Sequence, residues 1–169
     1  MAARKVLLLG EIGVGKTSLA QRLLFDHFDT NYKSTIGVDL YKYDIEIPGE
    51  AESPVSLVLW DTDGNWGESL FRHVYVKGAS AALIVGDAAR RATQETMLAL
   101  AAGFDDAQPG RPITLVPNKI DLPPETGEVD MPAALRETPF PFFKTSAKSG
   151  TNVHDAFVGT TRAILRRGL

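Results

Sequence analysis

The sequence predicts an α/β fold: a six-stranded, mostly parallel sheet with one antiparallel edge strand and helices on both faces. Short apolar runs alternate with helical stretches along the 169 residues, and two of these runs are separated only by a turn. Apolar residues make up 44% of the chain and charged residues 23%, which are globular proportions. We therefore expect a single folded domain over residues 1–169.

The first half of the chain predicts two strands of a hairpin beside a strand and a helix. Residues 6–9 form a continuous apolar run that is typical of a buried strand. Residues 16–25 carry apolar side chains at helical spacing. Residues 38–47 alternate between apolar and polar, and after a Pro-Gly turn residues 55–60 are apolar again. These two runs predict the hairpin that supplies the antiparallel edge strand.

The second half continues the alternation after an irregular polar stretch at residues 61–77. Strands are predicted over residues 81–85, 112–116 and 140–144, and helices over residues 89–104, 131–136 and 153–165. Such alternation produces a parallel sheet with helices on both faces. Ligands of these sheets bind beyond the carboxyl ends of the strands, which is where each motif below begins.

The composition excludes several classes of protein. A net charge of −3 without a basic tract argues against nucleic acid as the main partner. The chain has no cysteine, so it has neither disulfides nor the thiol that prenyl and palmitoyl anchors need, and Ala2 breaks the myristoylation signal. Without a membrane-length apolar run or a signal peptide, we expect a cytoplasmic monomer with no lipid anchor in this chain. A chain trimmed before a lipidated tail would have the same composition.

A phosphate-binding loop is predicted directly after the first strand. Residues 10–17 read Gly-Glu-Ile-Gly-Val-Gly-Lys-Thr, which fits the pattern Gly, four residues, Gly-Lys-Ser/Thr. Glycines let successive amides turn inward around an anion, and the following helix adds its positive end. Lys16 can reach the β- and γ-phosphates and Thr17 can ligate Mg²⁺. The predicted phosphate-site residues are Gly13, Val14, Gly15, Lys16, Thr17 and Ser18. The alternative is a glycine-rich turn that binds nothing.

Two later motifs also follow strands: Asn118-Lys119-Ile120-Asp121 and Thr145-Ser146-Ala147-Lys148. With them the chain resembles the Ras superfamily of small GTPases across nearly its whole length, and Rab-type members most closely in places. The resemblance implies the P-loop NTPase fold known as the G domain, with GTP or GDP as the bound nucleotide. The missing lipid site is compatible with a bacterial or otherwise non-lipidated member.

The resemblance assigns the guanine base to these two motifs. Asp121 is assigned to the guanine N1 and N2 donors, because a carboxylate accepts two parallel hydrogen bonds. Adenine has no such pair of donors, so discrimination of about 10⁴-fold is feasible. By resemblance, Asn118 ties this motif to the phosphate loop and the Lys119 stem covers the base. Taken alone, Asn-Lys-x-Asp is also compatible with a simple Asx-type turn.

The resemblance assigns further base contacts to three segments. The Ala147 amide would donate to guanine O6, while Ser146 and Lys148 hold its loop in place. Phe28 occupies the position of the aromatic residue at the base edge. The alternatives are an ordinary helix start for residues 146–148 and a core aromatic for Phe28.

The resemblance also implies two switch segments. Thr35, in Thr35-Ile36-Gly37, would ligate Mg²⁺ and meet the γ-phosphate, and Tyr32 would close over the phosphates. In Asp61-Thr62-Asp63-Gly64, Asp61 would hold Mg²⁺ and the Gly64 amide would bond the γ-phosphate. Because these contacts depend on the γ-phosphate, residues 30–38 and 61–77 would present a different surface to effector and regulator proteins in each nucleotide state.

Three positions depart from the family pattern. Asn65 replaces the glutamine that orients the attacking water, and its stem is one carbon shorter, roughly 1.5 Å. Asp63 replaces an alanine, and Ile12 stands where many members carry a small residue. We therefore expect slow GTP hydrolysis with Lys16, Thr35, Gly64 and Asn65 as its catalytic residues. The alternatives are a guanine-nucleotide-binding interaction module with little or no hydrolysis and, against the base motifs, an ATP-using kinase.

Overall fold

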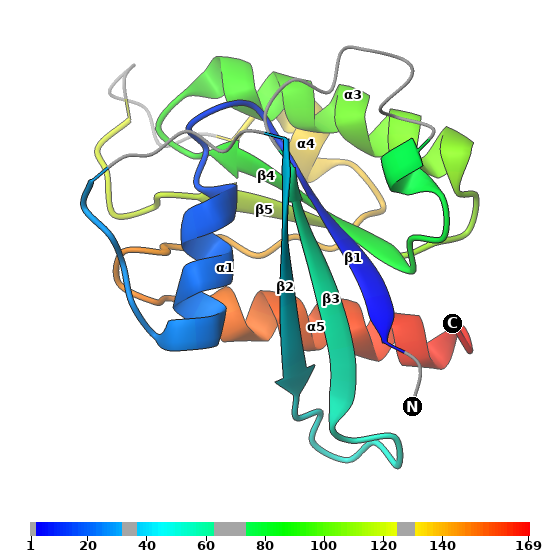
Figure 1. The fold of residues 1–169 in the computed structure, drawn as a ribbon. Coiled ribbons are helices and arrows are strands. Elements are labelled where there is room, and N and C mark those ends of the chain that lie inside the picture. Colours follow the sequence, from blue (N-terminus) through cyan, green and yellow to red (C-terminus); the bar gives the residue numbers. More distant parts are fainter. Residues whose placement is uncertain (1–2, 32–36, 63–73, 125–130) are drawn as a thin grey trace.

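The computed structural model describes residues 3–31, 37–62, 74–124 and 131–169. Within these ranges, five strands form one sheet in the order β2-β3-β1-β4-β5 (Figure 1). The strands are β1 (Arg4–Leu9), β2 (Val38–Ile45), β3 (Val55–Thr62), β4 (Ala81–Asp87) and β5 (Ile113–Asn118). The helices whose bounds the structure describes are α1 (Lys16–Phe25), α3 (Arg91–Ala107), α4 (Ala133–Arg136) and α5 (Val153–Arg166), and residues 74–76 are also helical.

The sheet separates two apolar cores. Helices α1 and α5 pack on one face and α3 and α4 on the other (Figure 1). Strand β1 contributes to both cores in alternation, with Val6 and Leu8 on the α1 side and Leu7 and Leu9 on the α3 side. A strand covered on both faces needs apolar residues at every position, which explains the unbroken apolar run. None of the helices in the described ranges is long and apolar enough to cross a membrane.

The predicted architecture is confirmed in its main features. Strand β1 pairs in parallel with β3 and β4, and β4 pairs in parallel with β5. Strand β2 pairs antiparallel with β3, from Val38 opposite Thr62 to Ile45 opposite Val55, and forms the edge. Helix α1 has the predicted bounds. The chain leaves β1 toward β3 on one side and reaches β4 on the other, so the loop after β1 lies at a topological switch point.

The prediction of a sixth strand at residues 140–144 is wrong. This segment forms one parallel bridge, between Phe142 and Leu115 of β5, where the Leu115 amide donates to the Pro141 carbonyl at 2.9 Å. Pro141 and Pro117 lack the N–H groups that would extend the ladder on either side of this bridge. The segment therefore runs beside β5 without becoming a strand.

Candidate functional site

The predicted site segments meet at one edge of the sheet. Strands β1, β3, β4 and β5 are mutually parallel, so their carboxyl ends lie together. These ends carry the phosphate loop at residues 10–17, Asp61, Asp87 and Asn118. Asp87 was not among the predicted site residues. A polar residue at the end of a buried parallel strand was the signal that could have found it.

Two glycines of the phosphate loop are required by close approach. A Cβ atom on Gly10 would lie 2.3 Å from the Val85 carbonyl oxygen of β4, and one on Gly15 would lie 2.4 Å from Nδ2 of Asn118. Gly15 also has φ of +102° and Gly13 has φ of +79°, values that favour glycine. The loop can therefore follow this path only with glycine at these places.

Lys16 folds back across the phosphate loop. It begins α1, it is only 6% exposed, and its Nζ donates to the Gly10 and Glu11 carbonyl oxygens at 2.8 Å each. Ser18 is half-buried in the first turn of the same helix. The buried ammonium group thus lies over the loop at the positive end of a helix, an arrangement that suits an anionic ligand.

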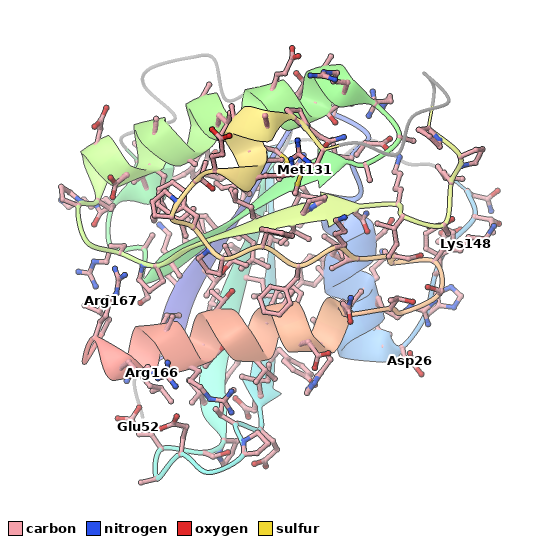
Figure 2. The ribbon with its side chains drawn as sticks, turned by 180° about the vertical axis from the view of Figure 1, so that it is seen from behind. Asp26, Glu52, Met131, Lys148, Arg166 and Arg167 are labelled. Atoms are coloured by element: carbon pink, nitrogen blue, oxygen red, sulfur yellow. The ribbon has the colours of Figure 1, made fainter. Side chains whose placement is uncertain are left out.

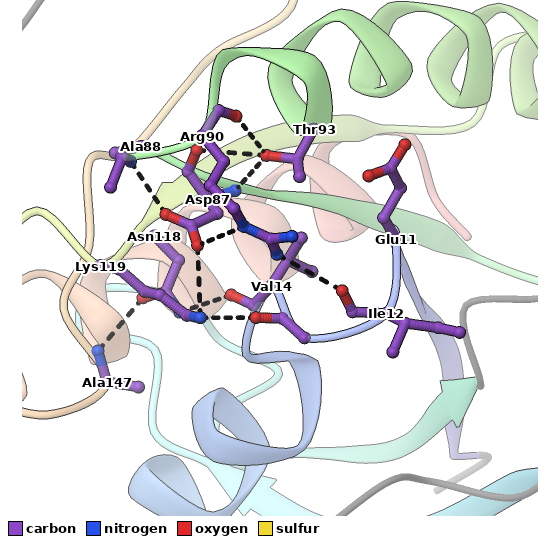
Figure 3. A network of polar contacts seen from close by, with 12 residues as sticks. Glu11, Ile12, Val14, Asp87, Ala88, Arg90, Thr93, Asn118, Lys119 and Ala147 are labelled. Carbon is purple, nitrogen blue, oxygen red and sulfur yellow. Dashed lines mark hydrogen bonds and ion pairs between the residues drawn. The ribbon is translucent and has the colours of Figure 1, made fainter. Parts of the chain in front are cut away.

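Asn118 joins three segments (Figure 3). Its Nδ2 donates to the Val14 carbonyl oxygen of the phosphate loop at 3.0 Å. Its Oδ1 accepts from the Thr145 hydroxyl at 3.0 Å and from the Ala147 amide at 3.2 Å. Asn118 is 1% exposed, so these bonds supply the partners that a buried amide group needs. They also fix the three segments relative to one another.

Lys119 links the phosphate loop to the end of β4 (Figure 3). Its Nζ donates to the Gly13 carbonyl oxygen at 2.5 Å and lies 3.3 Å from Oδ2 of Asp87. The same carboxylate accepts from the Ala89 amide and from Nε of Arg90, both at 2.9 Å. The buried Asp87 carboxylate therefore holds the Lys119 ammonium group against the phosphate loop.

Asp121 lies beside the loop that carries Ala147. Its side chain is exposed, and its Oδ1 accepts from the Ser146 hydroxyl at 2.8 Å. The Ser146 hydroxyl oxygen in turn accepts from the Ser149 amide at 3.1 Å. This pairing orients a solvent-facing carboxylate next to a backbone turn.

Asp61 and Thr17 meet at the other end of the phosphate loop. The Thr17 hydroxyl donates to Oδ2 of Asp61 at 2.5 Å. Asp61 is fully buried and its Oδ1 has no hydrogen-bond partner among the described residues. Burial raises the pKa of Asp61 to about 6, against the opposing effects of the Thr17 hydroxyl and the Lys16 charge. An orphaned buried carboxylate oxygen beside a hydroxyl fits an oxygen-ligated divalent cation.

The remaining predicted residues are placed less closely or fall outside the described ranges. Phe28 is half-buried and packs against the core on the α1 and α5 side of the sheet, which agrees with the core-aromatic alternative and leaves its assignment to the base a prediction. Lys148 is exposed on its loop. Residues Tyr32, Thr35, Gly64 and Asn65 lie outside the described residues, as do Ile36 and Asp63. Arg22, which contacts the loop of Ala147 and Lys148, has no sequence signal that would have singled it out.

The arrangement can be compared with known protein families. The sequence model of the Ras family matches residues 5–166. The chain belongs to the Ras family. The resemblance inferred from its motifs is therefore confirmed, and this Ras-family chain is a GTP-binding small GTPase that acts as a molecular switch.

Similar Ras-family proteins come from distant organisms. The chain is 36% identical to Ras-related protein Rab-32C of Dictyostelium discoideum, over 95% of this chain and 73% of that protein. It is 34% identical to Ras-related protein RABA1b of Arabidopsis thaliana, over 96% and 75% of the two chains. It is also 34% identical to Ras-related protein Rab-13 of Canis lupus familiaris, over 95% and 79%.

Proposed function

We propose that this Ras-family chain binds GTP and GDP with Mg²⁺ through the residues at the carboxyl edge of the sheet and hydrolyses GTP slowly. The observation that carries this proposal is the bonding of Asn118 to both the phosphate loop and the loop of Ala147. One buried side chain thereby sets the distance between a phosphate site and a base site. Such a fixed spacing suits a purine nucleotide.

The base would lie between Asp121, Lys119 and the loop of Ala147. Ser146 orients the exposed Asp121 carboxylate, which would accept the guanine N1 and N2 hydrogens. The Lys119 stem, whose ammonium group is held by Gly13 and Asp87, would cover one face of the base. The Ala147 amide donates to Asn118 Oδ1 at 3.2 Å. With nucleotide bound, the same N–H would also donate to guanine O6. Phe28 at the base edge and Lys148 on the loop complete the proposed base site.

The phosphates would lie in the loop between β1 and α1. Backbone amides of residues 13–18 and the Lys16 ammonium would bind them, because the loop glycines and the start of α1 favour an anion there. Tyr32, Thr35 and Gly64 complete the proposed phosphate contacts from the switch segments.

Thr17, Asp61 and Thr35 would hold Mg²⁺. The metal neutralises charge that develops on the phosphate oxygens during transfer. The orphaned Oδ1 of Asp61 supports this assignment, since a cation would relieve the unfavourable burial of that carboxylate. The described residues contain no group of three or more His, Asp or Glu side chains that could hold a metal ion by themselves. Mg²⁺ does not need such a group, because it is commonly bound by one carboxylate together with hydroxyl and phosphate oxygens.

Slow hydrolysis is proposed from the sequence at Asn65 and Ile12. The Ile12 side chain is 55% exposed at the tip of the phosphate loop, where it would obstruct an arginine supplied by a partner, a group worth about 10³ to 10⁵ in rate. Lys16, Thr35, Gly64 and Asn65 remain the proposed catalytic residues. The second candidate, a binding module with little hydrolysis, is favoured by the same shortened amide at Asn65.

Effector and regulator proteins would bind over residues 30–38 and 61–77. The described residues next to these segments support an apolar surface there. Leu40 is 57% exposed and Val74 is 62% exposed. Leu40 lies opposite Trp60 in the β2–β3 register, and the Trp60 and Tyr75 rings meet edge to face at 6.0 Å. Exposed apolar groups beside aromatic rings are typical of partner surfaces.

The test is the nucleotide content of the purified protein followed by a timed assay. We expect the protein to carry GDP or GTP rather than adenine nucleotides. In single-turnover assays, Asn65→Gln should hydrolyse GTP faster than the unaltered protein. An added activator protein that supplies an arginine should accelerate GTP hydrolysis by Ile12→Gly more than by the unaltered protein. Purification with ATP or ADP would contradict the proposed base site, whereas an unchanged rate for Asn65→Gln would contradict only the explanation for slow hydrolysis.

We also propose that residues 1–169 form a single domain and that the protein is a cytoplasmic monomer.

A further inference from the structure

Arg22 is the side chain that links helix α1 to the loop of Ala147 and Lys148. It lies in the last turn of α1, and its Nε donates to the Ala147 carbonyl oxygen at 2.7 Å. Its Nη2 donates to the Lys148 carbonyl oxygen. Its Nη1 donates to the Asp26 carbonyl oxygen at 3.0 Å and to Oδ1 of Asp26 at 3.1 Å. Figure 2 shows Asp26 and Lys148 at the same edge of the molecule, beside the end of α1.

These contacts use most of what a guanidinium group can offer. An arginine carries five N–H donors in a planar fork, and four hydrogen bonds from Arg22 are made here. The Arg22 side chain is only 15% exposed, so its bonds are partly protected from water. Hydrogen bonds from a charged donor are about twice as strong as neutral ones. The positive charge also lies at the negative end of α1, where it is favourable.

The two segments that Arg22 holds both lead to residues assigned to the base. The first carries Ala147, whose amide would meet guanine O6. The second begins at Asp26 and leads to Phe28, the proposed aromatic residue at the base edge. Asn118 bonds to the first loop through the Ala147 amide, and Arg22 bonds to it through the Ala147 and Lys148 carbonyl oxygens. With Arg22 removed, the loop would keep its bonds to Asn118 and Asp121 but would lose these bonds to α1, and the segment before Phe28 would lose its tie to the loop.

We propose that Arg22 is a positioning residue that sets how long guanine nucleotide is retained, by holding the Ala147 loop and the end of α1 in register around the base. This inference rests on the proposed base site. Arginine is required because lysine, with a single compact ammonium group, cannot reach two carbonyl oxygens and Asp26 at once. Arg22 acts through the backbone of Ala147 and does not itself contact the base.

The first measurement is the rate of GDP release from the full chain loaded with a fluorescent GDP analogue in Mg²⁺. Arg22→Met keeps the length of the side chain and removes its donors. We expect it to release GDP about tenfold faster or more, as for a lost charged hydrogen bond. Arg22→Lys should fall between this variant and the unaltered protein. The matched control is Arg162→Met, since Arg162 on α5 also donates to a carbonyl, that of Pro48, far from the base loops. It should leave GDP release unchanged.

The second measurement separates positioning from general loosening. 6-Thioguanosine diphosphate keeps the N1 and 2-amino hydrogens but replaces the O6 that Ala147 would bind with sulfur, a weaker acceptor, and inosine diphosphate lacks the 2-amino group that Asp121 would bind. In Arg22→Met, the preference for GDP over the 6-thio analogue should shrink, while the preference for GDP over inosine diphosphate should stay the same. Equal loss of both preferences, or GDP release at the unaltered rate in both Arg22 variants, would overturn the inference. Equal binding of ADP and GDP by the unaltered protein would instead overturn the proposed function.

Discussion

Nδ2 of Asn118 donates to the Val14 carbonyl oxygen at 3.0 Å, and this bond joins the end of β5 to the phosphate loop across 104 positions of the chain. The same side chain accepts from Ala147. The two parts of the proposed nucleotide site are therefore not independent loops, since one buried amide group belongs to both. Whatever shifts Asn118 should change the affinity for phosphate and for base together.

Asn118→Ala should reduce both stability and nucleotide affinity. The change removes three hydrogen bonds and leaves the Val14 carbonyl and the Thr145 hydroxyl without this buried partner, which we expect to cost about 2 to 4 kcal/mol of unfolding free energy. Denaturant unfolding of the GDP-loaded protein measures it. Asn31→Ala, at an exposed position, is the control and should change stability by less than about 0.5 kcal/mol. Similar values for the two variants would show that the Asn118 bonds are not structurally important.

Gly10→Ala should destabilise the fold because its Cβ atom would meet a backbone oxygen. The added carbon would lie 2.3 Å from the Val85 carbonyl, so β1 and β4 would have to shift apart, at a cost of about 1 to 3 kcal/mol. Gly103→Ala in α3 is the matched control, since nothing lies within 4 Å of its added carbon. This control should stabilise the protein by up to about 1 kcal/mol. Thermal unfolding of both variants compares them, and a neutral Gly10→Ala would disprove the close approach.

The affinity for Mg²⁺ should fall at low pH because the Asp61 carboxylate becomes protonated. Burial raises the pKa of this carboxyl to about 6, so below pH 6 a proton competes with the metal, and above pH 7 the carboxylate is ready to bind it. The quantity to measure is the Mg²⁺ concentration that slows GDP release half-maximally. When the pH is lowered from 7 to 5, this concentration should rise by a factor that is roughly tenfold larger for the unaltered protein than for Asp61→Asn. The variant corrects for protonation of the nucleotide phosphates. The same pH dependence in both proteins would exclude Asp61 as a metal ligand.

The sequence was informative where one physical requirement dominates. The buried run of β1 and the glycines before Lys16 follow from burial on two faces and from close backbone approach, and both were predictable. The segment at residues 140–144 was not, because its apolar pattern resembles a strand while Pro141 and Pro117 remove the donors of the ladder. Arg22 was equally out of reach, since its partners are backbone carbonyl groups 125 and 126 positions away, and a carbonyl group leaves no mark in the sequence.

The most direct test of the central claim is calorimetric titration of the unaltered protein and Asp121→Asn with GDP, ADP and xanthosine diphosphate in Mg²⁺. A carboxylate at position 121 should favour GDP over ADP by about 10⁴-fold. The asparagine amide should donate to the xanthine 2-oxo group. The variant should therefore bind GDP more weakly, and xanthosine diphosphate more tightly, than the unaltered protein does. Equal affinity of the unaltered protein for GDP and ADP, or GDP binding that Asp121→Asn leaves unchanged, would contradict the account.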